Sequence, residues 1–135
     1  MDGDATDDFR VLIAPGLHNS GPDHWQSRWQ HLFPAFERVE QDDWEAPDLE
    51  RWSARVDQTR RAGHGDPRPV LIVAHSFGSL ATAHSVARDP YGVAGVLLVA
   101  LGHINAESGL GDWPRGLETL YLLIDQVQNR TLAAH

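Results

Sequence analysis

Three continuous apolar runs constrain the fold of this chain more than any other feature of its sequence. They are FRVLIA (residues 9–14), PVLIVA (residues 69–74) and VAGVLLVAL (residues 93–101). A strand with one face in water alternates apolar and polar residues, whereas these runs do not, so each is expected to be a strand buried on both faces. Such strands occur mostly in parallel sheets that helices cover on both sides. The runs therefore predict an α/β fold.

The segments between and after these runs have the spacing of amphipathic helices. Apolar residues three and four positions apart predict four helices, at residues 24–33, 49–62, 78–89 and 115–129. Pro22 is expected in the first turn of the first helix. Asp48 is expected as the N-cap of the second helix and Gly63 as its end. FERVEQ, residues 36–41, alternates apolar and polar residues and predicts a fourth, shorter strand.

Length and composition limit the domain organisation and the classes of function. With 135 residues, 41% of them hydrophobic, residues 1–135 are expected to form a single domain, with the acidic residues 1–8 as a flexible tail. The net charge of −8 argues against nonspecific nucleic-acid binding. No apolar run reaches the ~20 residues that span a bilayer, so no membrane partner is expected. A cytoplasmic location is the default expectation.

The composition also bears on metals and cofactors. The chain has no cysteine, which excludes disulfides, thiolate zinc sites and a cysteine nucleophile. Its eight histidines show no spacing typical of a metal site. We therefore expect neither a metal nor a cofactor.

The stretch LIVAHSFGSLA, residues 71–81, places Ser76 where a buried strand gives way to a helix. Small residues two positions before and after it, Ala74 and Gly78, fit the Gly-x-Ser-x-Gly turn of a catalytic serine, with alanine in place of the first glycine. The helix would direct its positive N-terminal end at the serine, and the N–H of Phe77 would face a developing oxyanion. The alternative is a serine that only caps a helix.

The loop after the first strand, PGLHNSG at residues 15–21, is expected at the same sheet edge as Ser76. Gly16 would let the backbone turn back above the sheet, and the N–H of Leu17 is the candidate for a second oxyanion donor. The alternative is a plain Pro-Gly turn that ends the strand. Of the histidines outside the third apolar run and its loop, only His18 is a candidate to line the site.

His103 follows the third apolar run directly and is the candidate base for Ser76. The two strands that lead to these residues are expected to be neighbours, so both side chains would emerge at one edge of the sheet. A histidine within hydrogen-bonding reach of the serine could accept its proton. The alternative is a loop histidine at the start of a helix.

Four motifs spread over nearly the whole chain resemble one family. They are SGPDHWQSRW, DW…PDLERW, VAHSFG and GHINAESGLGDWPRG. Together they resemble small bacterial serine hydrolases of the α/β-hydrolase superfamily, the retinoblastoma-binding protein 9-like family. The resemblance implies a three-layer α/β-hydrolase-like fold and hydrolysis of a carboxylic ester or a related acyl bond in a small-molecule substrate. It also implies a Ser–His–Asp triad in which Ser76 is the nucleophile and His103 the base.

The chain departs from this family between the nucleophile and the base. Only 27 positions separate Ser76 from His103, dozens fewer than the family pattern implies, and the segment that carries the catalytic Asp is missing. Glu107 and Asp112 follow His103 closely and could replace the acid, although a surface or helix-capping role is the alternative for both. Two functions stay open: a serine hydrolase weakened by the loss of the acid, and a catalytically silent binding or interaction protein on the same fold.

The shortening also has a consequence for the sheet. The connection rules of hydrolases predict a mostly parallel sheet of about four strands, ordered 36–41, 9–14, 69–74, 93–101. The last strand would then lie at an edge, where its continuous apolar sequence lacks the charges and prolines that discourage pairing. We therefore expect a homodimer through this strand, or aggregation, unless the helix at 115–129 covers the edge.

Overall fold

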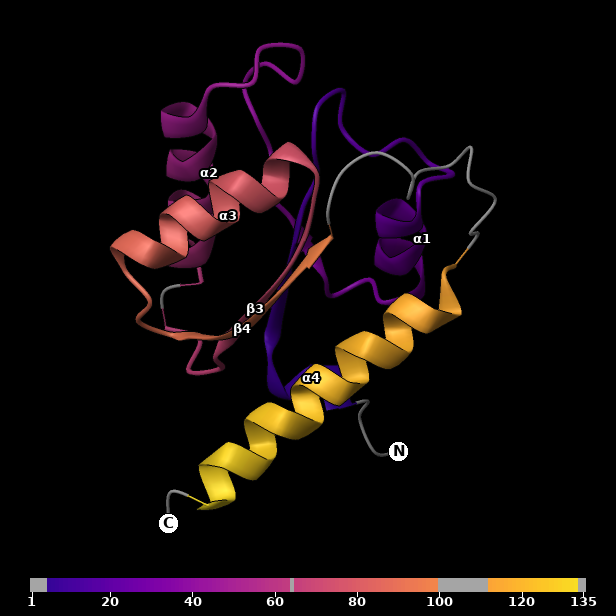
Figure 1. Ribbon diagram of the computed structural model, residues 1–135, viewed down its shortest axis with the longest axis vertical. Helices are drawn as coiled ribbons and strands as arrows, with labels where there is room; N and C mark the ends of the chain where they lie inside the picture. Colours follow the sequence, from indigo (N-terminus) through magenta and orange to yellow (C-terminus); the bar gives the residue numbers. More distant parts are fainter. Residues whose placement is uncertain (1–4, 64, 100–111, 134–135) are drawn as a thin grey trace.

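A computed structural model describes residues 5–63, 65–99 and 112–133 of the chain. Its strands form one parallel four-stranded sheet in the order β2-β1-β3-β4 (Figure 1). The strands are β1 (Arg10–Ala14), β2 (Glu37–Arg38), β3 (Val70–His75) and β4 (Val93–Val99). The α/β class, the parallel pairing and the strand order predicted from the sequence are confirmed. The predicted strand at residues 36–41 forms only at its two residues Glu37 and Arg38.

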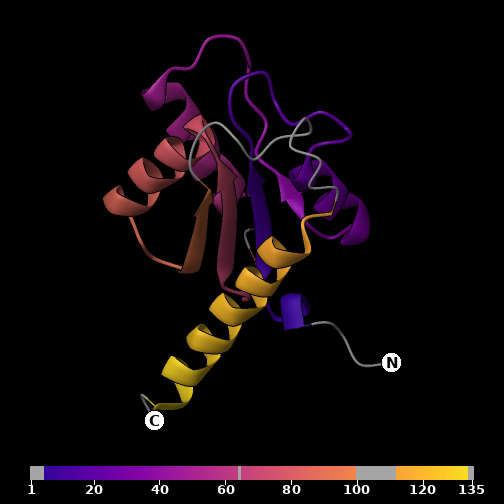
Figure 2. The ribbon, with the colours of Figure 1, turned by 45° about the vertical axis from the view of Figure 1, so that its right-hand side comes forward.

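In the described part of the chain, four α-helices cover the sheet in two layers, which gives the predicted three-layer arrangement (Figure 2). They are α1 (Trp25–Leu32), α2 (Leu49–Arg61), α3 (Phe77–Arg88) and α4 (Pro114–Ala133). Helices α1 and α4 pack on one face of the sheet through side chains such as Trp29 and Leu120. Helices α2 and α3 pack on the other face through side chains such as Trp52 and Ala81.

Apart from Arg10 at the start of β1 and His75 at the end of β3, the two central strands are apolar, because both of their faces are covered. Val11 and Ile13 of β1 belong to the core beneath α1 and α4, whereas Leu12 and Ala14 belong to the core beneath α2 and α3. Leu12 and Ile13 are fully buried. At ~25 cal/mol per Å² of apolar surface removed from water, burial of such side chains supplies most of the driving force for folding.

The helix ends agree with the sequence in part. Asp48 is the N-cap of α2, where its side chain accepts a hydrogen bond from the N–H of Arg51, as predicted. Gly63 lies just beyond the C-cap of that helix, where a Cβ would come within 2.2 Å of the Arg10 guanidinium. The expectation for Pro22 is wrong: α1 begins at Trp25, and His24 caps it by accepting a hydrogen bond from the N–H of Gln26.

The expected tail at residues 1–8 is partly ordered. Residues Ala5–Asp8 form a short 3-10 helix in which Thr6 is buried. Arg68 donates a hydrogen bond to the backbone oxygen of Asp7, and Gln128 of α4 donates one to the Asp8 carboxylate. Arg68 and Gln128 lie far from this segment in the sequence, and their hydrogen bonds hold it against the rest of the protein. Residues 1–4 lie outside the described part of the chain.

Among the residues that the structure describes, no helix is long and apolar enough to cross a membrane.

Strand β4 lies at one edge of the sheet, as predicted. Helix α4 packs on one of its faces, where a Cβ on Gly95 would come within 3.1 Å of the Leu123 side chain. Leu98 remains 45% exposed. Among the described residues, the backbone of β4 pairs only with β3, so α4 covers a face of the strand and not its outer edge.

Candidate active site

Ser76 lies between β3 and α3, at the carboxyl edge of the sheet, as the sequence predicts. Its backbone has φ 55° and ψ −127°, a left-handed conformation that costs free energy for a residue with a side chain. A serine that merely caps a helix has extended backbone, and its hydroxyl accepts a bond from the first turn. Ser76 makes no such capping bond. The geometry is that of a strained strand-to-helix turn that presents a side chain.

Small residues on both sides make this turn possible. Ala74 is fully buried and pairs with Ala14 of β1. A Cβ on Gly78 would lie 2.3 Å from the backbone oxygen of Ala14 and 2.4 Å from that of Pro15. The first turn of α3 therefore touches the loop after β1, backbone against backbone, and only glycine allows this approach.

The loop after β1 lies directly against the serine. A Cβ on Gly16 would come within 2.8 Å of the Ser76 Cβ and 3.3 Å of its Oγ. His18 donates its N–H to the Trp44 oxygen and Asn19 donates its N–H to the Gly16 oxygen, both at 3.0 Å. Between Gly16 and His18, the N–H of Leu17 donates no hydrogen bond to any of the described residues.

On the nucleophile side, the N–H of Phe77 also has no hydrogen-bond partner among the described residues. Phe77 is the first residue of α3, and a helix leaves its first N–H groups without an intrahelical acceptor. The N–H of Ser76 itself is used, because it donates to the Val99 oxygen of β4 at 3.0 Å. Among the described residues, the N–H groups of Leu17 and Phe77, which the sequence predicts as oxyanion donors, thus remain available beside Ser76.

The predicted base and one of its two candidate acids lie outside the described residues. These are His103 and Glu107. Asp112 is described, and its carboxylate accepts a hydrogen bond from the Arg28 side chain at 2.7 Å. Trp29 donates its indole N–H to the backbone oxygen of Asp112 at 2.6 Å. Asp112 is therefore engaged with helix α1, in keeping with the surface role that the sequence left open for it.

His18, the other histidine expected near the site, pairs with an acid of the neighbouring loop. Its Nδ1 lies 2.6 and 2.7 Å from the two carboxylate oxygens of Glu45. Both side chains are largely exposed. Among the residues that the structure describes, no group of three histidine, aspartate or glutamate side chains could hold a metal ion.

A network of buried polar side chains beneath the loop was not anticipated from the sequence. Gln26 of α1 is fully buried and bonds to the ends of β1 and β3. Arg38 of β2 donates to the Asn19 side chain and the Ser20 backbone oxygen, and burial lowers the pKa of its guanidinium. The one signal available was a polar residue, Gln26, directly beside Trp25 on a helix with a tryptophan-rich face.

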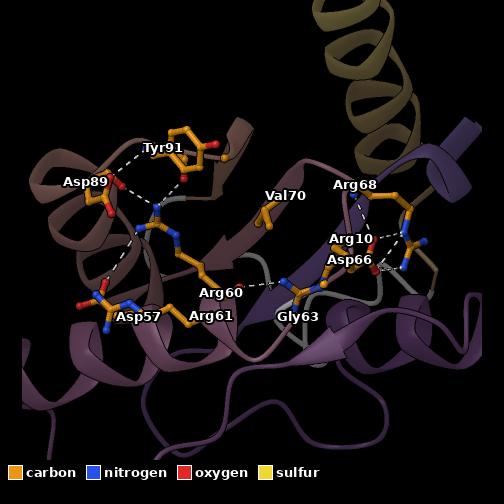
Figure 3. Close-up of a pocket in the computed structure, with 12 residues that line it drawn as sticks. Arg10, Asp57, Arg60, Arg61, Gly63, Asp66, Arg68, Val70, Asp89 and Tyr91 are labelled. Carbon is orange, nitrogen blue, oxygen red and sulfur yellow. Dashed lines mark hydrogen bonds and ion pairs between the residues drawn. The ribbon is translucent and has the colours of Figure 1, made fainter.

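A cavity of about 310 Å³ lies at the opposite end of the strands (Figure 3). It is lined by the first residues of β1 and β3, Arg10 and Val70, and by three further arginines. Arg68 lies beside Asp66 and, mainly through their side-chain hydrogen bond, lowers the pKa of that carboxyl to about 2. The arginines make this cavity a rival candidate for the functional site.

The cavity's arginines are, however, mostly engaged with the protein itself. Arg10 forms two hydrogen bonds with the Glu37 carboxylate and two with the last carbonyls of α2. Arg60 donates to Ser85 and to the carbonyls after α3, as the dashed lines to Asp89 and Tyr91 show (Figure 3). These side chains satisfy helix C-termini, which is a structural role. The carboxyl edge at Ser76 is therefore the better candidate.

A parallel α/β sheet with a strained serine turn and two available N–H groups defines an α/β-hydrolase-like protein. A sequence model of the family described as serine hydrolase matches residues 11–101, more than half of the chain, and the chain belongs to this family. The crystal structure of a protein described as a YdeN-like hydrolase, from Pectobacterium atrosepticum, is similar to it. The TM-score is 0.79 and the identity 27%, over 91% of this chain and 94% of the other. No protein of curated function matches the chain significantly.

Proposed function

We propose that this hydrolase cleaves a carboxylic ester or a related acyl bond of a small molecule through an acyl-enzyme on Ser76. The observation that carries the proposal is the strained backbone of Ser76, φ 55°, at a turn where its side chain makes no helix-capping bond. Strain of this kind persists only where the surrounding structure imposes it, and it is frequent at catalytic sites. Membership of the serine hydrolase family supports the same assignment.

In the proposed reaction, Ser76 Oγ attacks the acyl carbon and transfers its proton to His103. The carbonyl oxygen becomes an oxyanion, which the N–H groups of Leu17 and Phe77 stabilise. Collapse of this intermediate expels the alcohol, which takes the proton from His103, and leaves the acyl group on Ser76. Water then attacks the acyl-enzyme, with His103 again as base, and releases the acid and the free serine. Loss of one oxyanion donor typically lowers kcat by about 10²–10³.

We further propose that the chain is a shortened relative of the retinoblastoma-binding protein 9-like hydrolases and lacks their catalytic acid. Two observations support this: only 27 positions separate Ser76 from His103, and the carboxylate of Asp112 is bound by Arg28. A triad acid fixes the tautomer of its histidine and is worth about 10⁴ in kcat, while the oxyanion hole and binding still give about 10³–10⁴ over water. The expected activity is therefore low but measurable.

Hydrolysis of p-nitrophenyl acetate by the purified protein tests the proposal. We expect slow turnover that Ser76→Ala and His103→Ala each remove. Ser79→Ala is the matched control, since Ser79 lies one turn away on α3 and its hydroxyl donates to the Val99 oxygen. Turnover that survives Ser76→Ala would overturn the assignment. A folded protein with no Ser76-dependent turnover would favour the silent binding protein, and turnover like that of efficient esterases would reveal an unrecognised acid.

A further inference from the structure

We infer that Gln26 is a positioning residue. It fixes the spacing between the loop at residues 15–21, here called the oxyanion loop, and the turn at residues 75–78, here called the nucleophile turn. The inference rests on the proposed function and adds to it a residue that touches no substrate. Gln26 lies on α1 and is 0% exposed. Its Nε2 donates to the backbone oxygen of Ala14 at 3.3 Å and to that of Val73 at 3.2 Å. One amide group thus joins two neighbouring strands.

Both acceptors lie where a strand leads into the site. Ala14 is the last residue of β1 and directly precedes Pro15 and Gly16 of the oxyanion loop. Val73 lies three positions before Ser76 on β3. The ladder between β1 and β3 ends at the pair of Ala14 and Ala74, while β3 stays paired with β4 as far as His75. Beyond Ala14 and Ala74, the ladder no longer sets the separation of the two segments.

The third bond of Gln26 reaches the far end of the oxyanion loop. Its Oε1 accepts a hydrogen bond from the Ser20 hydroxyl at 2.6 Å, and Ser20 is buried. Arg38 holds the same stretch from β2 through the Asn19 side chain and the Ser20 oxygen, at 2.7 and 3.0 Å. Gln26 therefore uses both hydrogens of its amide and its oxygen, which fixes the orientation of that amide.

This arrangement holds the loop at both ends while its middle contacts the serine. The loop's Gly16 lies against Ser76, and the N–H of Leu17 follows it in the chain. Stabilisation of an oxyanion requires its donors within about 0.5 Å of the correct positions. A displacement of about 1 Å can lower the rate by about 10²-fold. Loss of the Gln26 bonds should therefore lower kcat and leave KM largely unchanged, because the loop position matters most in the transition state.

The test compares Gln26→Met with the milder Ser20→Ala. Methionine keeps the length of the side chain and removes every hydrogen bond, whereas Ser20→Ala deletes only the bond between Ser20 and Gln26. Ile124→Ala is the control, because Ile124 is buried on α4 in the same core and belongs to neither the loop after β1 nor the turn at Ser76. Kinetics with p-nitrophenyl acetate are measured at a temperature where far-ultraviolet circular dichroism shows every variant folded. Backbone hydrogen exchange is followed on the same samples.

We expect kcat to fall by about 10–100-fold in Gln26→Met and by a smaller factor in Ser20→Ala, with KM within about twofold. We also expect faster hydrogen exchange at residues 16–20 and 76–78 in Gln26→Met and not in Ile124→Ala. An equal fall of kcat in Ile124→Ala, or unchanged exchange at these residues in Gln26→Met, overturns the inference. If wild-type turnover proves independent of Ser76, the proposed function fails, and the exchange data alone decide whether Gln26 holds the two segments together.

Discussion

Replacement of Gly78 by alanine should damage both the site and the fold. The new Cβ would lie 2.3 Å from the Ala14 oxygen and 2.4 Å from the Pro15 oxygen, where ordinary contacts begin at 3.4 Å. Both acceptors are backbone atoms, so α3 and the oxyanion loop must separate by about 1 Å. A misplacement of this size can cost about 10²-fold in kcat. Overpacking typically costs about 1–3 kcal/mol of stability.

The higher helix propensity of alanine partly offsets the loss of stability expected in Gly78→Ala. Alanine favours a helix over glycine by up to about 1 kcal/mol, so any net destabilisation must come from the clash. Because 1 kcal/mol shifts the Tm of a chain of this length by roughly 3–4 °C, the Tm should fall by several degrees.

The matched control is Gly21→Ala. Gly21 is exposed in the same loop region, and a Cβ there would meet no atom within 4 Å. Calorimetry gives the Tm of both variants, and p-nitrophenyl acetate hydrolysis gives kcat. We expect Gly21→Ala to retain wild-type kcat and Tm. If Gly78→Ala is as active and as stable as Gly21→Ala, the close approach of helix and loop is wrong.

Two further predictions concern the ends and the edge of the sheet. Arg68 lowers the folded-state pKa of Asp66 to about 2 from an ordinary value near 4, so their ion pair stabilises the folded protein above pH 4, and this stabilisation is lost as the pH falls toward 2. The Tm of Asp66→Asn should therefore lie below that of the wild type at neutral pH, and the difference should shrink between pH 4 and pH 2. A difference that stays constant over this range contradicts the pairing. The apolar edge strand β4, with Leu98 45% exposed, should make the protein associate; light scattering after size exclusion should show dimers or larger species that Leu98→Lys reduces, and a clean wild-type monomer at high concentration would count against this.

The fold could be predicted largely because burial on both faces leaves a direct trace in the sequence. The runs at residues 9–14, 69–74 and 93–101 lack polar alternation, and β1, β3 and β4 (Val93–Val99) lie within them. Both faces of β1 and β3 are buried, whereas Leu98 of β4 remains partly exposed. The short strand β2 was harder to predict. Its two residues are polar. Glu37 accepts hydrogen bonds from Arg10 of β1, and Arg38 donates one to the Asn19 side chain.

The nucleophile turn could be predicted for a similar reason: its requirements are local. Small residues at Ala74 and Gly78 are needed wherever a strand turns sharply into a helix, and the positive φ of Ser76 follows from that turn. The burial of Gln26 could not be predicted, because nothing in its own segment shows that two strand ends will need its amide. Such networks depend on contacts between segments far apart in the chain.

The roles of His103 and of a triad acid remain predictions from the sequence. His103 is the predicted base because it follows a buried strand and because the family resemblance implies this role. Of the two carboxylates that could replace the triad acid, that of Asp112 forms an ion pair with Arg28. His103→Ala kinetics address the base directly, and the size of wild-type turnover addresses the acid.

Reaction with a fluorophosphonate probe tests the central claim, that Ser76 is an activated nucleophile. Only a serine with a base and an oxyanion site reacts readily with such a probe. Intact-mass spectrometry should show one adduct on the folded wild-type protein and on Ser79→Ala, with peptide mapping placing it on Ser76. We expect no adduct on Ser76→Ala or on denatured protein. An unlabelled wild-type protein, or an adduct that persists in Ser76→Ala, would contradict the account.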